Sequence, residues 1–157
     1  ISSQFGLQVL DVRPHAGQHQ LTRERQTWQH NPDLCCKINK VLPMQALRAS
    51  HRVWVSGLLG EQTSHRNKHR VFEWHDDILK FHPMIDQPLQ AVKEYIARHG
   101  LPVNPLLQKG YGSVGCVQCT HPGEGRSGRW KNSGKTECGL HLRGSARPDN
   151  KLLCNQA

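Results

Sequence analysis

The alternation of apolar and polar positions along the chain predicts short strands separated by helices. Apolar runs over residues 5–12, 53–58 and 78–83 are typical of strands, and proline closes the first and the third of them. Apolar residues at helical spacing predict helices over residues 33–47 and 86–98, whereas the polar residues 15–32 predict a loop. Because strands and helices alternate with short connections, the pattern predicts an α/β fold with a mostly parallel sheet flanked by helices.

Individual residues refine the predicted helices. Pro43 lies inside the first helical pattern and predicts a kink or a division there. Asp86 predicts a cap at the start of the second helix, and Gly100 lies just past its end. The apolar face of that helix predicts packing against a core; its members are Leu89, Val92, Tyr95 and Ile96. Residues 61–68 predict the start of one more helix.

Composition predicts a small core and an anionic partner. Only 36% of the 157 residues are hydrophobic, and the mean hydropathy is -0.66. The formal net charge of +9 favours a nucleic acid, a phosphorylated small molecule or an acidic protein as partner. Aromatic residues make up 6% of the chain, and no basic stripe is interleaved with them, so the pattern favours a small polyanion over nucleic acid.

The chain carries no pattern of a membrane span or of a secretory signal. No apolar run approaches the ~18 residues that a span needs, and no charged segment leads into an apolar one at the N-terminus. We therefore expect a cytoplasmic protein with no membrane partner, whose six cysteines stay reduced and serve metal binding or catalysis. The chain begins at Ile1 inside a predicted element, which we interpret as a fragment or a processed piece; a homo-oligomer is compatible with the sequence.

Four of the cysteines form two close pairs. Cys35 and Cys36 are adjacent, and Cys116 and Cys119 have a spacing common among metal ligands. Four thiolates suit zinc or an iron–sulfur cluster, but adjacent side chains on a helix diverge by about 100°, which fits separated irons better than one tetrahedral zinc. The adjacent pair alone is equally well explained as two small buried hydrophobic side chains. All four together favour a metal site.

A fifth cysteine, Cys138, is a candidate nucleophile. It stands in the segment Glu137-Cys138-Gly139-Leu140-His141, and nucleophilic attack requires its thiolate. The nearby Lys135, His141 and Arg143 favour ionisation, whereas Glu137 opposes it. The alternative is a surface thiol with no role. The sixth cysteine, Cys154, lies in a polar C-terminal segment and is interpreted as incidental.

Basic residues form a third candidate set. Arg126 and Arg129 lie three residues apart in a glycine-rich loop, and Arg66 and Lys40 lie beside predicted strand ends. Guanidinium groups bind phosphate and sulfate through two parallel hydrogen bonds. The alternative for each of them is ordinary solvated surface charge.

Taken together, these residues resemble the assimilatory adenylyl-sulfate and phosphoadenylyl-sulfate reductases. The resemblance runs from about Asp33 to His141 and depends on an ordered set of motifs. These are the adjacent cysteines followed by Lys40, residues 54–58 (WVSGL), Gln62-Thr63 leading to Arg66, residues 101–106 (LPVNPL), residues 110–120 (GYGSVGCVQCT), Gly128-Arg129-Trp130, and the pentapeptide 137–141 (ECGLH).

The resemblance implies a fold, a reaction and a set of roles. The fold would be part of an adenine-nucleotide-hydrolase-like (Rossmann-like) parallel sheet flanked by helices, with a loop-rich C-terminal tail. Cys138 would attack the sulfonate sulfur of adenylyl sulfate, AMP would leave, and a thioredoxin or glutaredoxin would release sulfite from the S-sulfonated cysteine. The four paired cysteines would hold a [4Fe-4S] cluster, which in this family accompanies a preference for adenylyl sulfate over its 3′-phosphorylated form. The substrate-binding residues would be Lys40, Gln62, Arg66, Arg126, Arg129 and His141.

The chain also departs from the family pattern. Leu58-Leu59-Gly60 replaces the usual Gly-x-Arg, Asn39 replaces a common arginine, and the N-terminal phosphate-loop part is not among these residues. We divide the chain into residues 1–119, the C-terminal part of the reductase domain with the cluster cysteines, and residues 120–157, a flexible segment with the catalytic cysteine. Two other functions stay open, a non-catalytic iron–sulfur or zinc module and a related sulfur-transfer enzyme that acts on nucleic acid.

Overall fold

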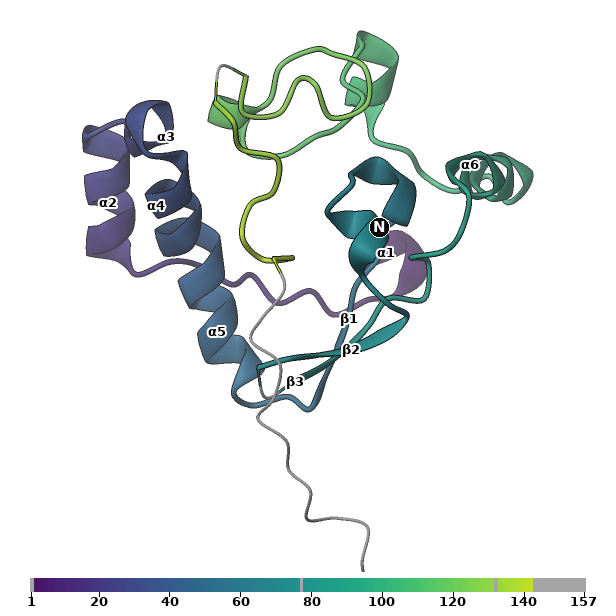
Figure 1. Ribbon diagram of the computed structural model, residues 1–157, viewed down its shortest axis with the longest axis horizontal. Coiled ribbons are helices and arrows are strands. Elements are labelled where there is room, and N and C mark those ends of the chain that lie inside the picture. The colour runs from purple at the N-terminus through teal and green to yellow at the C-terminus, as the bar shows by residue number, and fades with distance from the viewer. Residues whose placement is uncertain (1, 77, 132, 143–157) are drawn as a thin grey trace, which may run out of the picture.

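A three-stranded sheet lies beside a group of four helices in this computed structural model, which describes residues 2–76, 78–131 and 133–142 (Figure 1). The strands are β1 (Val53–Val55), β2 (Phe72–His75) and β3 (Ile78–Phe81). The helices are α1 (Ser2–Phe5), α2 (Ala16–Glu24), α3 (Thr27–His30), α4 (Pro32–Cys36), α5 (Leu42–Arg48) and α6 (Leu89–Arg98). The predicted α/β class, a sheet flanked by helices, is confirmed.

The sheet is mixed. Its order is β1-β3-β2, with β1 parallel to β3 and β2 antiparallel to β3. The apolar pattern located β1 and β3, although β1 ends at Val55 and not at residue 58. It missed β2 because Phe72–His75 alternates aromatic residues with Glu73 and His75, so no continuous apolar run is present.

The two faces of this sheet differ in polarity. Strand register places Trp54 and Glu73 on either side of Lys80, on one face. That face is covered, and Lys80 and Ile78 are almost fully buried there. Phe72 and Phe81 stack on the opposite face, where Val55 is 62% exposed. The sheet therefore turns its charged face toward the interior of the chain, which suits a site for an anion better than a purely structural core.

Residues 15–32, predicted to be a loop, form α2 and α3 instead. The His- and Gln-rich composition obscured this, and α2 has only a modest apolar face, on which Thr22 is buried. Asn31 then begins α4 by accepting a hydrogen bond on its side chain from the backbone N–H of Leu34 at 3.0 Å.

The helix predicted over residues 33–47 is α4 and α5 joined by a π-helical turn, Lys37–Val41. The N–H of Leu42 donates to the carbonyl oxygen of Lys37, one residue further back than in an α-helix. Pro43 lies at the start of α5, where its missing N–H is tolerated. The predicted division is therefore present, as a wider turn that precedes the proline.

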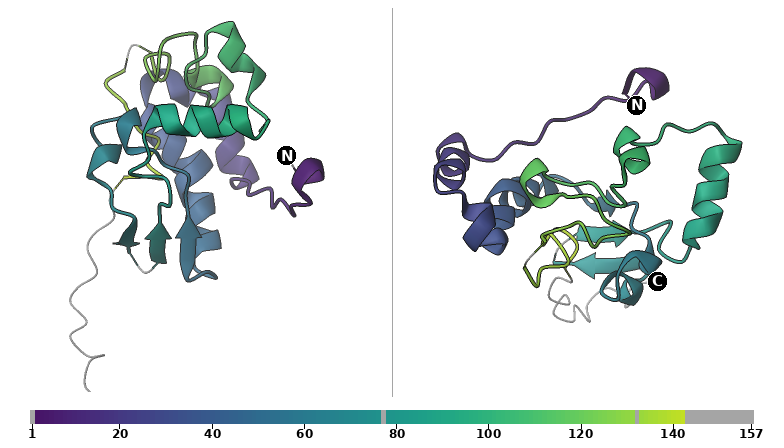
Figure 2. Two further views of the ribbon diagram at one scale, coloured as in Figure 1. Left: turned by 90° about the vertical axis from the view of Figure 1, so that its right-hand side faces the viewer. Right: turned by 90° about the horizontal axis from the view of Figure 1, so that it is seen from above.

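The N-terminal strand prediction is wrong. Residues 7–15 form no helix or strand, and Leu7, Val9 and Leu10 are 54%, 73% and 70% exposed. The segment runs from α1 to α2 away from the sheet (Figure 2), so no strand of the described residues lies beside it to accept its backbone hydrogen bonds.

The second predicted helix is present as α6, but neither its predicted cap nor its predicted packing is observed. Pro88 precedes its first residue, and the carboxylate of Glu61, not that of Asp86, accepts a hydrogen bond from the N–H of Leu89 at 2.8 Å. None of the α6 side chains is buried, so the apolar stripe does not pack into a core within the described residues. The helix predicted from residue 61 is instead two short 3₁₀ turns, Gly60–Gln62 and Arg66–Lys68.

The segment that carries Cys138 runs between the α4–α5 arm and the polar face of the sheet, and it is drawn in yellow-green in Figure 1. On the helix side, Gly139 lies so close to Val41 that a Cβ on it would be 3.1 Å from a methyl carbon. On the sheet side, Lys80 donates to the carbonyl oxygen of Leu140 at 3.2 Å. The predicted division at residue 119 stays a prediction; Cys154 and the rest of the segment beyond residue 142 lie outside the described residues. No helix of the described part is long and apolar enough to cross a membrane.

Candidate active site

The two cysteine pairs converge on one cavity. Cys35 and Cys36 come from the end of α4, while Cys116 precedes a 3₁₀ turn and Cys119 is the last residue of that turn. All four line a cavity of about 110 Å³, together with Trp28, Asn39, Lys40 and neighbouring polar side chains. The cysteines are free thiols. The sequence therefore identified four residues, from positions 80 apart in the chain, that share one chamber.

These four thiols fit a cluster with several iron atoms. Among the described residues, no three of their sulfur atoms lie within 4.8 Å of one another, as the ligands of a single ion would. They surround a space instead, as ligands to separate irons would. Burial raises the pKa of Cys35 and Cys119, and raises that of Cys36 to about 11. Metal coordination would supply the positive charge that these buried thiolates lack.

Lys40 lies on the wall of this chamber. It belongs to the π-helical turn, and its ammonium group hydrogen-bonds Cys116. Burial works to lower its pKa, but the hydrogen bond to Cys116 and the charges of Cys138 and Cys36 outweigh that effect and raise it. Lys40 is therefore a fixed cation between the four-cysteine chamber and Cys138.

Cys138 is half-buried and packs against the cluster formed by Cys36, Cys119 and Trp130. Three cationic side chains lie within electrostatic range of Cys138: Lys40, Lys80 and Arg126. Positive charge at this point stabilises a thiolate and equally an anionic group bound beside it. The arrangement suits a nucleophilic cysteine that meets an anion.

Glu137 is the anchor of the Cys138 segment. Its side chain is 2% exposed, and Arg66 binds both of its oxygens, with Nε to Oε1 at 2.7 Å and Nη2 to Oε2 at 3.0 Å. Thr63 donates to Oε1 at 3.2 Å, and Arg126 approaches Oε2 at 3.4 Å. Burial tends to raise the pKa of Glu137, but Arg66 and Arg126 outweigh it and lower the pKa, so the carboxylate stays ionised.

The six predicted substrate-binding residues lie in four places in the structure; Lys40 is on the chamber wall, and His141 packs on the sheet. Arg66, Gln62 and Arg126 gather at Glu137: Arg66 donates to the side-chain oxygen of Gln62, and Arg126 also donates to the carbonyl oxygen of Thr136 at 2.8 Å. Arg129 lies elsewhere, with its guanidinium 4.4 Å from the Trp130 ring and 3.1 Å from the carbonyl oxygen of Val114.

Arg129 also depends on a glycine. A Cβ on Gly115 would lie 2.1 Å from the Arg129 guanidinium, so this position must be glycine for the arginine to reach the loop before Cys116. In the described structure Arg129 therefore holds the loop that presents two of the chamber cysteines.

His141 packs its ring 5.8 Å from the ring of Trp54 on the polar face of the sheet. Burial, with Lys80 and Arg66 nearby, lowers its pKa to about 3. The imidazole is therefore neutral at physiological pH and supplies no positive charge to Cys138. Its carbonyl oxygen is 3.1 Å from Nε2 of His65.

Sequence reasoning missed Lys80 altogether. It is fully buried, its ammonium group lies 4.5 Å from the Trp54 ring centroid, and it donates to Leu140. Burial lowers its pKa to about 8. The signal was present, since a lysine in the middle of the strand Ile78–Phe81 interrupts an apolar run.

Replacing Lys80 with methionine is expected to release the Cys138 segment while the fold is kept. Methionine fills a similar volume but cannot donate to Leu140, and hydrogen bonds from charged donors contribute about 1.5–3 kcal/mol. Amide hydrogen exchange over residues 137–141 should then accelerate by roughly tenfold or more, with an unchanged circular dichroism spectrum. Lys93→Met, on the exposed α6, serves as the control. Unchanged protection of residues 137–141 would show that Lys80 does not anchor the segment.

Comparison with known proteins shows the family of this chain. The sequence model of the phosphoadenosine phosphosulfate reductase domain matches residues 1–122. An adenosine 5'-phosphosulfate reductase of Bacillus cytotoxicus is 46% identical over 121 residues, covering 73% of this chain and 51% of the relative. A protein of the same name from Bacillus mycoides is 43% identical over 122 residues, covering 73% of this chain and 52% of the relative.

The chain belongs to the phosphoadenosine phosphosulfate reductase domain family. It spans about half the length of the curated relatives that it matches. The match to the family ends at residue 122, so the Glu137–His141 pentapeptide lies beyond it. The resemblance inferred from the sequence motifs is confirmed.

Proposed function

We propose that this chain carries the cysteine chamber and the nucleophile of a thiol-dependent adenylyl-sulfate reductase that acts in sulfate assimilation in the cytoplasm. The observation that carries the proposal is the position of Cys138 among Lys40, Lys80 and Arg126, beside a chamber lined by four further cysteines. The relatives named adenosine 5'-phosphosulfate reductase supply the substrate class.

In the proposed first step, the Cys138 thiolate attacks the sulfonate sulfur of adenylyl sulfate. A sulfur–sulfur bond forms, the bond from sulfur to the bridging phosphate oxygen breaks, and AMP leaves with that electron pair. Lys40, Lys80 and Arg126 lie within electrostatic range of Cys138, and in this proposal they balance the negative charge of the incoming and leaving groups. Arg66, which also donates to Gln62, holds Glu137, and Glu137 fixes the backbone on which Cys138 is presented.

In the second step, a dithiol protein of the thioredoxin or glutaredoxin class attacks the Cys138 sulfur and releases sulfite. Its second thiol then resolves the mixed disulfide and returns Cys138 as a thiol. The dithiol is oxidised by two electrons, and the substrate sulfur is reduced from sulfate to sulfite. The half-exposed position of Cys138 fits this requirement for access by a protein partner.

We assign Cys35, Cys36, Cys116 and Cys119 as the residues that would hold a [4Fe-4S] cluster. When bound, the cluster would supply positive charge and polarisation next to Lys40, while the dithiol supplies the electrons. In this assignment Arg129 positions the Cys116 loop, and His141 packs the segment against the sheet as a neutral ring.

Metal content and sulfite release test the proposal together. Anaerobically purified protein should contain about four irons and four acid-labile sulfides per chain, and Cys116→Ser should lose most of them while Cys154→Ser keeps them. Sulfite release from adenylyl sulfate with reduced thioredoxin is measured with the chain alone and with the unmatched part of the Bacillus cytotoxicus relative added. Iron without sulfite in both assays would show a metal-binding module with no such activity and would overturn the proposed reaction. Zinc in place of iron, lost when Cys116 is replaced by serine, would overturn the cluster.

A further inference from the structure

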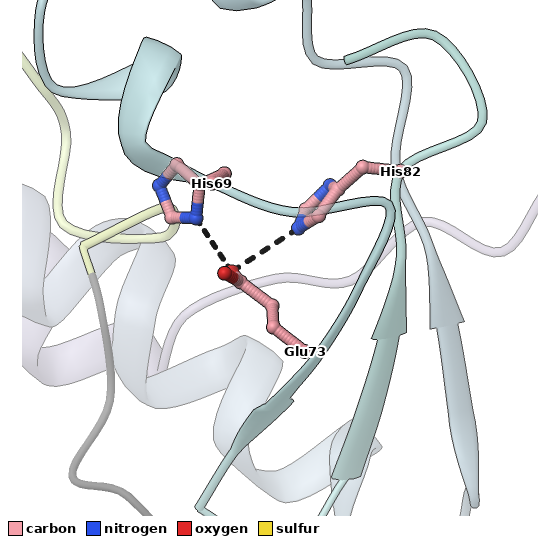
Figure 3. Close-up of side chains that lie close together, drawn as sticks. All are labelled: His69, Glu73 and His82. Carbon is pink, nitrogen blue, oxygen red and sulfur yellow. Dashed lines mark hydrogen bonds and ion pairs between the residues drawn. The ribbon is translucent and has the colours of Figure 1, made fainter. Parts of the chain in front are cut away.

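A second group of metal-ligating side chains lies apart from the cysteine chamber. His69 follows the 3₁₀ turn Arg66–Lys68, Glu73 lies in β2, and His82 comes directly after β3. One ligand atom from each of the three lies within 4.8 Å of the other two. Figure 3 shows the two imidazole rings pointing at the carboxylate from opposite sides. We propose that His69, Glu73 and His82 form a zinc site that fastens the turn carrying Arg66 to the sheet.

The geometry is close to that of a bound ion. Ligand atoms about 2.1 Å from a tetrahedral zinc are roughly 3.4 Å apart. Nε2 of His82 is 3.3 Å from Oε1 of Glu73, which matches this spacing. Nδ1 of His69 is 2.5 Å from the same oxygen, so this short hydrogen bond would open by roughly 1 Å when an ion replaces its proton. Three separate chain segments therefore need only a small local movement to bind the ion.

Burial sets this group apart from ordinary surface histidines and acids. The side chains of His69 and His82 have no solvent exposure, and that of Glu73 is 13% exposed. The distal nitrogens, Nε2 of His69 and Nδ1 of His82, have no hydrogen-bond partner among the described residues. Each imidazole therefore has Glu73 as its polar partner here. Burying three titratable groups against one another is costly, and a cation at their centre would offset that cost.

One charged side chain of the sheet lies next to this group. Lys80 is the cross-strand neighbour of Glu73, but its ammonium group is directed to Leu140.

The donor set selects the ion. Two imidazole nitrogens and one carboxylate oxygen form a zinc-type set, whereas magnesium and calcium prefer oxygen ligands. Three protein ligands leave a fourth position, which a water molecule can occupy. The resulting link would be mechanical: His69 follows directly on the turn that carries Arg66, and Arg66 holds Glu137 beside Cys138.

Matched amide variants separate a zinc site from a hydrogen-bonded triad. Asparagine in place of His69 and glutamine in place of His82 keep an N–H donor near the Nδ1 and Nε2 positions but bind zinc poorly. In the full chain, the double variant His69→Asn/His82→Gln should lose one zinc per chain, and its affinity for added Zn²⁺, measured by competition with a chelator, should fall by about 100-fold or more. His99→Gln, an exposed histidine of α6, is the control and should match the unsubstituted chain.

Cobalt distinguishes this site from the cysteines. Co²⁺ bound by nitrogen and oxygen lacks the thiolate charge-transfer absorption that Co²⁺ at cysteines produces in the near ultraviolet. We expect the unsubstituted chain to bind Co²⁺ with a spectrum that lacks the thiolate absorption. The double variant should lose this cobalt spectrum. Added Zn²⁺ should also raise the melting temperature of the unsubstituted chain and not that of the variant. Equal zinc content in the two proteins, or cobalt bound with thiolate absorption only, would overturn the site. Neither outcome depends on sulfite release.

Discussion

Cys138→Ser is expected to abolish sulfite release while leaving the iron content unchanged. A serine hydroxyl is a far weaker nucleophile than a thiolate, and its product would be an ester that a dithiol cannot reduce. The loss should be about 10⁴-fold or more, as for other enzymes that lose their nucleophile. The four chamber cysteines do not include Cys138, so iron binding should persist.

The intermediate gives a second readout of the same substitution. Incubation with adenylyl sulfate and no dithiol should add the mass of one sulfonate to the unsubstituted protein, on the peptide that contains Cys138. Cys154→Ser should still acquire this mass, and Cys138→Ser should not. Sulfite release by Cys138→Ser at the unsubstituted rate would show that another group is the nucleophile.

Glu137→Ala is expected to destabilise the protein by about 3–5 kcal/mol. The substitution leaves Arg66 buried and without its carboxylate partner, and breaking a buried ion pair on one side is more costly than removing both partners. Urea unfolding should show a lower midpoint with a similar slope. Glu124→Ala, an exposed glutamate of the neighbouring loop, should shift the midpoint very little.

The double substitution Glu137→Ala/Arg66→Met refines this prediction. If the cost comes from the uncompensated guanidinium, removing it as well should recover part of the lost stability. The pH dependence follows from the lowered pKa of Glu137: the stabilisation is present above its unfolded value of 4.5 and is lost as the pH falls through the lower folded value. Additive effects of the two substitutions would contradict the coupling.

The sequence located the four chamber cysteines more accurately than the helices and strands around them. Motif spacing identified Cys35, Cys36, Cys116 and Cys119, and the structure places them around one chamber. Cysteines that are close in sequence can be recognised from their spacing. Lys80 and Glu137 instead act through contacts with Leu140 and Arg66, which are 60 and 71 residues away in sequence. Such contacts are set by strand register and by the course of the last segment, which a local pattern does not contain.

The fold predictions were wrong where the apolar pattern of a segment does not match the position of that segment in the structure. Residues 5–12 are apolar, but a strand also needs a neighbour to accept its hydrogen bonds, and the described residues provide none there. Residues 16–24 are polar yet helical, because a helix satisfies its backbone hydrogen bonds within itself. β2 was missed because its inward residues are Glu73 and His75. These side chains are polar, and the search for strands relied on runs of apolar residues.

The π-helical turn Lys37–Val41 sets the rotational phase between the cysteine pair and the rest of its helix. A turn that holds one extra residue is equivalent to a single-residue insertion, and taking it out would rotate α4 by about 100° relative to α5. Cys35 and Cys36 would then point away from Cys116 and Cys119, and Lys40 would leave the wall between the chamber and Cys138. The length of this turn, as much as the identity of any residue in it, brings the two halves of the thiol set together, so single-residue deletions here should be tolerated far less than substitutions.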